Sequence, residues 1–303
     1  MENQTFIKEF ILIGFSQNLQ ICILLFSTFF IIYILTILEN GFLIFTVIVS
    51  PQMHTPMYYF LGNLSFLDLC FSSGTIPKLL IDLLSQNRRI SVIACLTQMK
   101  TVLVLAGIEC ILLAVMAYDR YIAICYPLNY TIIMSWRVCR NVTIIMWLTS
   151  LIFFVAPTIV KPFVFCKENQ VNHFFCEVLA ILELACGDIS FYTITIVVVG
   201  LFILISPITF ITASYICIIA SILRIQSAQG RTKAFSTCAS HLTVVFMFFG
   251  TSIITYMGQA RFSSYLKYIS VNYTILTPVL NPLMYSLRNK DVKEAFRKIL
   301  TKY

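Results

Sequence analysis

The segment FYTITIVVVGLFILISPITFITASYICIIASIL, residues 191–223, contains no Asp, Glu, Lys or Arg. A helix of about 20 apolar residues crosses the hydrocarbon core of a bilayer, so this longer segment must tilt or protrude. Further continuous apolar runs accompany it, unlike the alternating segments of a transmembrane β-barrel. The seven expected spans are 21–49, 57–84, 93–124, 142–160, 191–223, 234–257 and 268–287. The sequence therefore predicts an all-α membrane protein built as a seven-helix bundle.

The composition supports this prediction. Of 303 residues, 59% are hydrophobic and 11% are charged, whereas soluble domains carry about 25% charged residues. The spans leave no room for a soluble domain, so we expect one domain over residues 1–303. It consists of an extracellular tail (1–20), the bundle (21–288) and a cytoplasmic tail (289–303). The first segment lacks the pattern of a cleaved signal peptide, so the first span is expected to act as an uncleaved signal anchor.

The distribution of Lys and Arg predicts the orientation. They outnumber Asp and Glu on the side that holds residues 120–140, 224–233 and the C-terminal tail, and nearly balance them on the other side. Cytoplasmic loops carry such an excess. We therefore expect a multi-pass plasma-membrane protein with an extracellular N-terminus and a cytoplasmic C-terminus. The net charge of +8 reflects this topology, and no basic patch interleaved with aromatic residues predicts a nucleic-acid partner.

Both ends of the chain carry further signals of this topology. In the tail 289–303, the apolar residues Val292, Phe296 and Ile299 recur at helical spacing opposite Lys and Arg. This pattern predicts an amphipathic helix on the inner leaflet, with membrane lipid as a partner; a disordered basic tail is the alternative. At the other end, NQT forms a glycosylation sequon at Asn3.

Cysteines cluster in the predicted outer segments, where the compartment permits disulfides. Four of them allow three connectivities, and they are Cys95, Cys166, Cys176 and Cys186.

Two carboxyl groups lie inside predicted spans: Asp68 in LSFLDLC and Glu109 in AGIECILLAV. Intramembrane ionisable groups are functional candidates. Near one another, they would share a proton, bind a cation such as sodium or pair with polar neighbours; a structural hydrogen-bond network is the alternative. Glu109 precedes Arg120 by almost three helical turns, so both are expected on one helix face. Glu39 in the first span also needs a partner, which the sequence does not identify.

The sequence contains no recognisable catalytic or metal-binding constellation. Its histidines, His54, His173 and His241, lie in different segments. There is no HExxH motif, paired-cysteine metal spacing or glycine-rich phosphate loop. We therefore expect neither an enzyme nor a cofactor, apart from a candidate sodium ion near Asp68 and Glu109.

Five motifs occur in a characteristic order along the chain: HTPMYYFLGNLSFLDLC (54–70), MAYDRYIAICYPLNY (116–130), SY (214–215), KAFSTCASHL (233–242) and PVLNPLMYSLRN (278–289). Three outer cysteines follow one another at ten-residue steps, Cys166, Cys176 and Cys186. With these motifs the chain resembles the olfactory receptors, a family of rhodopsin-like G-protein-coupled receptors. The resemblance covers essentially the whole chain.

The resemblance implies an activation switch at the inner end of the third span. Asp119 is expected to hold Arg120 at rest. On activation the sixth span moves outward and Arg120 joins the G-protein cavity near Tyr215 and Tyr285. A guanidinium with several donors and two sets of partners suits such a two-state element. The implied switch residues are Asp119, Arg120, Tyr121, Tyr215, Asn281, Pro282 and Tyr285.

The resemblance also implies the disulfides Cys95–Cys176 and Cys166–Cys186, and an odorant pocket in the outer half of the bundle. Val102 stands where aminergic relatives hold an aspartate, which disfavours a cationic amine. Phe249 replaces the family's usual tyrosine, and Glu39 and Asn129 replace its usual glycine and histidine. The implied pocket residues are Val102, Leu103, Ala106, Gly107, Val199, Ile203, Phe249, Ser252, Ile253, Tyr256 and Thr274.

The implied function is an odorant receptor that binds small, hydrophobic, volatile ligands. It would activate a heterotrimeric G protein of the stimulatory olfactory type and raise cyclic AMP. A transporter or channel using Asp68 and Glu109 is the alternative, but the halves show no internal repeat and seven spans do not divide into equal inverted units. An intramembrane enzyme would have only these two acids as candidate catalytic groups.

Overall fold

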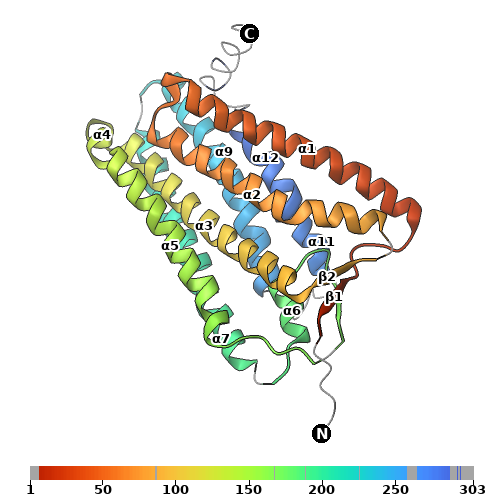
Figure 1. The fold of residues 1–303 in the computed structure, drawn as a ribbon. Coiled ribbons are helices and arrows are strands. Elements are labelled where there is room, and N and C mark those ends of the chain that lie inside the picture. Colours follow the sequence, from red (N-terminus) through yellow and green to blue (C-terminus); the bar gives the residue numbers. More distant parts are fainter. Residues whose placement is uncertain are drawn as a thin grey trace.

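The computed structural model describes residues 7–85, 87–166, 168–187, 189–224, 226–257, 265–286, 292 and 294. Long helices run side by side through the bundle (Figure 1). Five of them are α1 (Leu19–Val49), α2 (Pro56–Leu84), α3 (Val92–Cys125), α5 (Trp136–Val160) and α9 (Ala228–Met257). The fifth span combines α7 (Ser190–Gly200), the π-helical turn η3 (Leu201–Ile205) and α8 (Ser206–Leu223). The seventh combines α11 (Leu266–Val271), the π-helical turn η5 (Asn272–Leu276) and α12 (Thr277–Ser286).

These helical runs confirm the predicted fold class. In the described residues, six helices are long and apolar enough to cross a membrane, and the seventh predicted span is the run divided by η5. Two helices begin more than one turn before their predicted spans: α5 at Trp136 and α9 at Ala228. Arg137 and Arg140, which lie between the third and fourth predicted spans, are exposed residues in the first turns of α5. The helices thus extend beyond their apolar segments, and hydropathy locates only the apolar part.

Side-chain caps mark the start of α1 and α3, and a proline marks the start of α2. The Asn18 side chain accepts hydrogen bonds from the backbone N–H groups of Gln20 and Ile21, at 2.9 and 3.4 Å. Ser91 Oγ accepts from Ala94 N at 3.2 Å at the start of α3. Pro56 occupies the first position of α2, where its missing N–H has no helical partner to lose.

Proline explains the two π-helical turns. Pro207 and Pro278 have no backbone N–H, so the carbonyls four residues earlier, on Ile203 and Thr274, lose their usual helical donors. Both carbonyls lie within the π turns η3 and η5. Such turns often occur at functional sites. Near η5, the Asn40 amide donates to Pro278 O at 2.9 Å and ties α1 to the seventh span.

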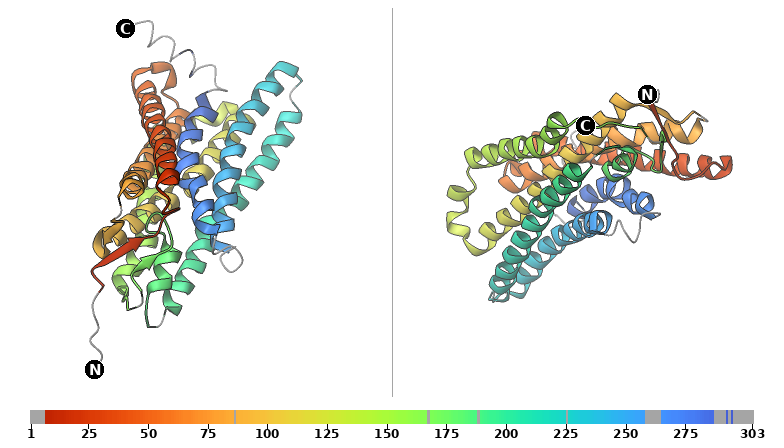
Figure 2. Two further views of the ribbon diagram at one scale, coloured as in Figure 1. Left: turned by 90° about the vertical axis from the view of Figure 1, so that its right-hand side faces the viewer. Right: turned by 90° about the horizontal axis from the view of Figure 1, so that it is seen from below.

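A small sheet caps one end of the bundle. Strand β1 (Glu9–Leu12) pairs antiparallel with β2 (Arg89–Ser91) and parallel with β3 (Gln170–Val171). β1, β2 and the short helix α6 (Val178–Leu184) lie at the same end, opposite α4 (Tyr130–Ile133) and the 3-10 turns η1 (Pro51–Met53) and η2 (Pro127–Asn129) (Figures 1 and 2). Phe10 and Leu12 are almost fully buried. Part of the segment predicted as a tail therefore belongs to the folded structure.

The core of the bundle lies around α3. In its most apolar stretch 61% of the residues are buried, compared with 17% for α1 and 11% for α5. The exposed faces of α1 and α5 carry Leu, Ile, Val and Phe, which suits contact with lipid. The predictions for Asn3 and for most of the tail 289–303 lie outside the described residues; within that tail, Val292 is buried and Glu294 is exposed.

Candidate functional site: an outer cavity above an inner polar network

Asp68 and Glu109 meet in the middle of the bundle. Both are buried, with 2% and 6% exposure, and they approach within electrostatic range. Asn281 from α12 donates to both Asp68 carboxyl oxygens at 3.1 Å and also interacts with Glu109. Glu109 Oε1 is buried without a hydrogen-bond partner among the described residues. Two adjacent buried negative charges are costly, and the contacts of Asn281 with both carboxyl groups show that a polar neighbour contributes to their stabilisation.

The inner end of α3 carries Asp119 and Arg120, both buried. The Tyr130 hydroxyl, from α4, donates to Asp119 Oδ1 at 2.8 Å. The Arg120 guanidinium carbon lies 6.0 Å from the Tyr285 ring centroid on α12, and Asp119 is within electrostatic range of Arg120. Burial and the nearby Asp119 carboxylate raise the pKa of Tyr130, so this tyrosine remains a hydrogen-bond donor.

A histidine connects three helices beside this region. Tyr215 Oη on α8 lies 2.8 Å from His241 Nδ1, and His241 Nε2 lies 3.1 Å from Leu113 O on α3. A carbonyl only accepts, so Nε2 carries the proton and Nδ1 accepts from Tyr215. His241 is completely buried on α9. The sequence-based predictions assign no role to His241, although a histidine in an apolar span is a signal of function.

The other implied switch residues have different surroundings. Tyr121 is not fully buried, and its hydroxyl donates to Tyr126 Oη at 3.4 Å. Tyr215 and Tyr285 are buried, and Pro282 is a buried residue within α12, next to Asn281. The structure thus brings Arg120 and Tyr285 together and leaves Tyr121 in a surface aromatic cluster.

An apolar cavity of about 110 Å³, called here the main cavity, lies in the half of the bundle near the sheet. A smaller cavity of about 30 Å³, the side cavity, shares several of its walls. The predicted residues that line the main cavity are Leu103, Ala106, Gly107, Val199, Ile203, Ser252 and Tyr256. Val102 lines the side cavity.

Three predicted pocket residues line neither cavity as formed by the described residues: Phe249, Ile253 and Thr274. Phe248 lines both cavities in place of Phe249, which packs edge-on against it at 5.4 Å between ring centroids. Thr274 is fully buried and donates to Ser270 O at 2.6 Å. On α9 the residues that line the cavity, Phe248, Ser252 and Tyr256, are therefore four positions apart. Phe249, which replaces the family's usual tyrosine, lies next to this face and not on it.

Gly107 allows α3 and α5 to approach closely at the cavity wall. A Cβ atom at this position would lie 2.4 Å from Phe154 Cε2 and 3.2 Å from Ser150 Oγ. Phe154 also lines the main cavity. A larger residue at 107 must therefore move Phe154 and reshape the cavity.

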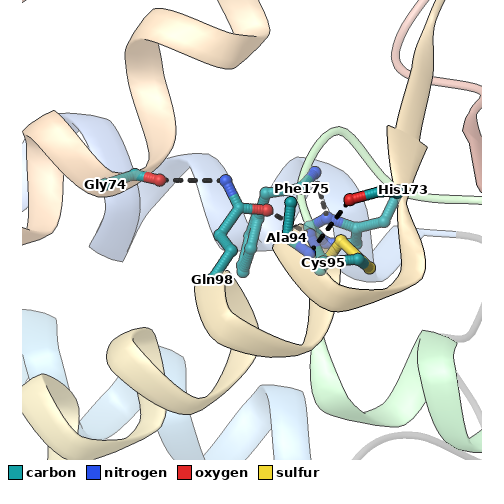
Figure 3. Close-up of a disulfide and its surroundings, with 8 residues drawn as sticks. Gly74, Ala94, Cys95, Gln98, His173 and Phe175 are labelled. Atoms are coloured by element: carbon teal, nitrogen blue, oxygen red, sulfur yellow. Dashed lines mark hydrogen bonds between the residues drawn. A yellow bond between two sulfur atoms is a disulfide. The ribbon is translucent and has the colours of Figure 1, made fainter.

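The outer loop closes the cavities from the sheet side. The structure contains the disulfides Cys95–Cys176 and Cys166–Cys186. Gln98 donates to Gly74 O and accepts from Cys176 N, both at 2.9 Å, so it joins α2, α3 and the loop (Figure 3).

His173 and Glu177 order this loop from within. His173 Nδ1 accepts from Phe175 N at 3.3 Å, and its Nε2 lies 3.2 Å from Ser270 Oγ on α11. Burial, with the nearby Lys267 charge, lowers the pKa of His173 to about 3, so the ring is neutral at physiological pH. Glu177 caps α6, and burial raises its pKa to about 7.

Comparison with known proteins decides the family. A family model described as Olfactory receptor matches residues 29–303. The chain belongs to the olfactory receptor family. It is 42% identical to Olfactory receptor 2A7 of Mus musculus, over 98% of this chain and 97% of that relative. It is 45% identical to Olfactory receptor 13H1 of Homo sapiens, over 100% of this chain and 99% of that relative.

Squid rhodopsin shares the fold of this olfactory receptor. The two align with a TM-score of 0.70 over 95% of this chain and 87% of the other, at 18% sequence identity. At that identity the likeness concerns the fold alone. Family membership makes the chain a multi-pass plasma-membrane odorant receptor that couples to G proteins, and not an enzyme.

Several walls of the receptor's main cavity were absent from the sequence-based expectation. Phe154 and Pro157 come from α5, Phe163 and Leu182 from the outer loop, and Tyr192 from the start of α7. The resemblance pointed only to the third, fifth, sixth and seventh spans. The loop residues had no usable signal, because their position depends on the two disulfides and on pairing with distant strands.

Proposed function

We propose that this receptor detects small, apolar odorants in the main cavity and activates a G protein of the stimulatory olfactory type, which raises cyclic AMP. The observation that carries the proposal is the position of the main cavity on α3 and α9. Leu103 and Ala106 line it on α3, outward of Glu109 and Arg120 on the same helix. Ser252 and Tyr256 line it on α9, outward of His241.

In this proposal α9 transmits the signal. A ligand against Ser252 and Tyr256 shifts α9, and the Tyr215–His241–Leu113 connection is the contact that must rearrange. Arg120, now beside Tyr285, would then exchange partners as the inner ends of the helices separate. Asp119 accepts a hydrogen bond from Tyr130 on the inner loop, so Asp119 can stay in place while Arg120 moves.

We also propose that the N-terminus is extracellular and the C-terminus cytoplasmic. The excess of Lys and Arg on the α4 side of the bundle supports this orientation, as do the two disulfides on the sheet side. With this topology we also propose that Asn3 is glycosylated and that the C-terminal tail forms an amphipathic helix on the inner leaflet.

A sodium ion between Asp68 and Glu109 is a further proposal about the resting receptor. Among the described residues, no group of three or more His, Cys, Asp or Glu side chains is arranged for a metal. The oxygens available nonetheless suit a hard monovalent cation: the unpartnered Glu109 Oε1 and, one turn after Asp68, the buried Ser72 Oγ, which also lacks a partner in the described structure. Replacing sodium with choline in the medium should raise basal activity if the ion stabilises the resting state.

Cyclic AMP production in cells exposed to an odorant panel tests the proposed function. We expect a concentration-dependent response in cells that express the receptor, and its loss in Arg120→Ala at equal surface expression. Full signalling by Arg120→Ala would contradict the mechanism. Odorant-independent ion flux through liposomes that contain the purified protein would instead favour the channel alternative.

A further inference from the structure

The two carboxyl oxygens of Glu177, in the outer loop, differ in their hydrogen bonding. Oε2 accepts from Leu179 N at 2.7 Å and from Ala180 N at 3.1 Å, and so caps α6. Oε1 is buried and has no hydrogen-bond partner among the described residues. The residue is only 6% exposed, so bulk water does not readily satisfy Oε1. Helix capping therefore accounts for Oε2, whereas a buried Oε1 needs a hydrogen-bond donor.

The position of Glu177 suggests where that donor comes from. Glu177 lines the side cavity together with Val102, Tyr256 and Tyr273. The side cavity shares Ala106 and Tyr256 with the main cavity. The carboxyl group thus lines a cavity that adjoins the main cavity, and the other walls of both cavities are mostly apolar.

Five of the hydroxyl groups that line the two cavities already donate their protons to other protein groups. Ser252 donates to Phe248 O at 2.9 Å, and Tyr273 donates to Ser270 Oγ at 3.1 Å. Three further lining hydroxyls donate to backbone carbonyls: Thr158 to Val155, Thr195 to Phe191 and Tyr192 to Lys161. These oxygens can still accept. The cavities therefore offer mainly acceptors, of which Glu177 Oε1 is the strongest, and Tyr256 adds a hydroxyl that can also donate.

We propose that Glu177 Oε1 anchors the polar group of the ligand, and that the receptor prefers small apolar alcohols and phenols over ethers and ketones of the same size. A hydroxyl ligand supplies the donor that Oε1 lacks, whereas an ether or ketone places a second acceptor against it. This inference rests on the proposed function, because it assigns a ligand class to the same cavities.

Isomeric pairs test the inference in cells that express the receptor. We would compare 1-octanol with heptyl methyl ether, and 4-ethylphenol with 4-methylanisole, since each pair has one formula and differs in the donor. We expect the wild-type receptor to respond to at least one alcohol or phenol at about tenfold lower concentration than to its ether isomer, because hydrogen bonds to charged groups are the stronger kind. Equal potency within both pairs, or preference for the ethers, would overturn the inference.

Three variants separate the anchor from the helix cap. Glu177→Asp keeps a good capping carboxylate but shortens its reach into the cavity, and Glu177→Gln replaces an acceptor with an amide that also donates. We expect both to reach the cell surface and to lose most of the preference for hydroxyl ligands. Glu183→Gln, an exposed change on the same helix, should keep it. Retention of the full preference in Glu177→Gln would overturn the role of this residue even if another variant failed to fold.

A binding measurement distinguishes failure of this inference from failure of the proposed function. Thermal unfolding of the purified receptor with each isomer reads binding without a G protein. Stabilisation by the alcohols without any cyclic AMP response would contradict the proposed coupling and keep the ligand class. Cyclic AMP responses to the ethers alone would keep the coupling and overturn the ligand class.

Discussion

The outer and inner halves of α3 are built from opposite chemistry. The outer half contributes Leu103 and Ala106 to an apolar cavity, whereas the inner half buries Glu109, Asp119 and Arg120. An apolar cavity binds ligands by shape, and its few polar groups determine which ligands it selects. Buried charges must have partners, so a small movement that exchanges those partners has a large energetic effect. We therefore propose that α3 detects the odorant at its outer end and switches at its inner end.

The largest expected effect comes from cutting the disulfide that closes the outer half. Cys176→Ser should destabilise the receptor by about 2–5 kcal/mol, the usual consequence of losing a native disulfide, and should abolish its surface expression. Antibody labelling of intact cells measures this. Cys217→Ser is the matched control, because Cys217 is an exposed free thiol on α8. Normal expression and response of Cys176→Ser would show that the outer half is stable without this link.

Gly107→Ala tests the shape of the main cavity. The added methyl group would lie 2.4 Å from Phe154 Cε2, so Phe154 must move; overpacking of this kind costs about 1–3 kcal/mol, and we expect odorant potency to fall about tenfold. Basal cyclic AMP should stay unchanged, since the inner half is untouched. Gly41→Ala is the control, because a Cβ there meets no described atom within 4 Å. Similar dose–response curves for the two variants would remove Gly107 from the site.

Tyr215→Phe tests the inner half alone. It removes the hydrogen bond to His241, worth about 1 kcal/mol, so basal cyclic AMP should rise about fivefold if this bond holds α9 in the resting position. Odorant binding in the thermal-unfolding measurement should persist. Tyr33→Phe removes a tyrosine hydroxyl bond between α1 and α2 and should leave the basal level unchanged. A lower basal level in Tyr215→Phe would assign the bond to the active state.

The smallest expected effect is a pH dependence of the outer half. The pKa of Glu177 is raised to about 7, mainly by burial and further by Glu183, so its ionised fraction grows between about pH 6 and about pH 8. Since the carboxylate is the better acceptor, alcohol potency should increase about threefold over that interval. His173, with a pKa of about 3, does not titrate there. The potency of Glu177→Gln should be flat, and a parallel rise in that variant would assign the effect to another group.

The sequence predicted the bundle well because membrane helices are encoded locally by apolar length. Each predicted span has a helical run over nearly the same residues, and the largest differences are the earlier starts of α5 at Trp136 and of α9 at Ala228. The resemblance to olfactory receptors also pointed to Ser252 and Tyr256, which line the main cavity, but it named Phe249 where Phe248 lines the cavity. A rotation of one residue depends on packing with other helices, which a single sequence does not encode. Sequence patterns alone did not reveal strand β1, the free oxygen of Glu177 or the contacts of His241, since each requires partners far away in the chain.

Movement of α9 in response to an odorant is the most direct test of how the two halves are connected. Spin labels at Thr232 on α9 and Arg137 on α5, both exposed, would be attached in a Cys217→Ser background, and their separation measured by electron paramagnetic resonance. We predict that an active odorant lengthens this distance, and that Gly107→Ala requires more odorant for the same change. An unchanged distance at saturating odorant, with binding shown by thermal unfolding, would contradict the connection between the cavity and the switch.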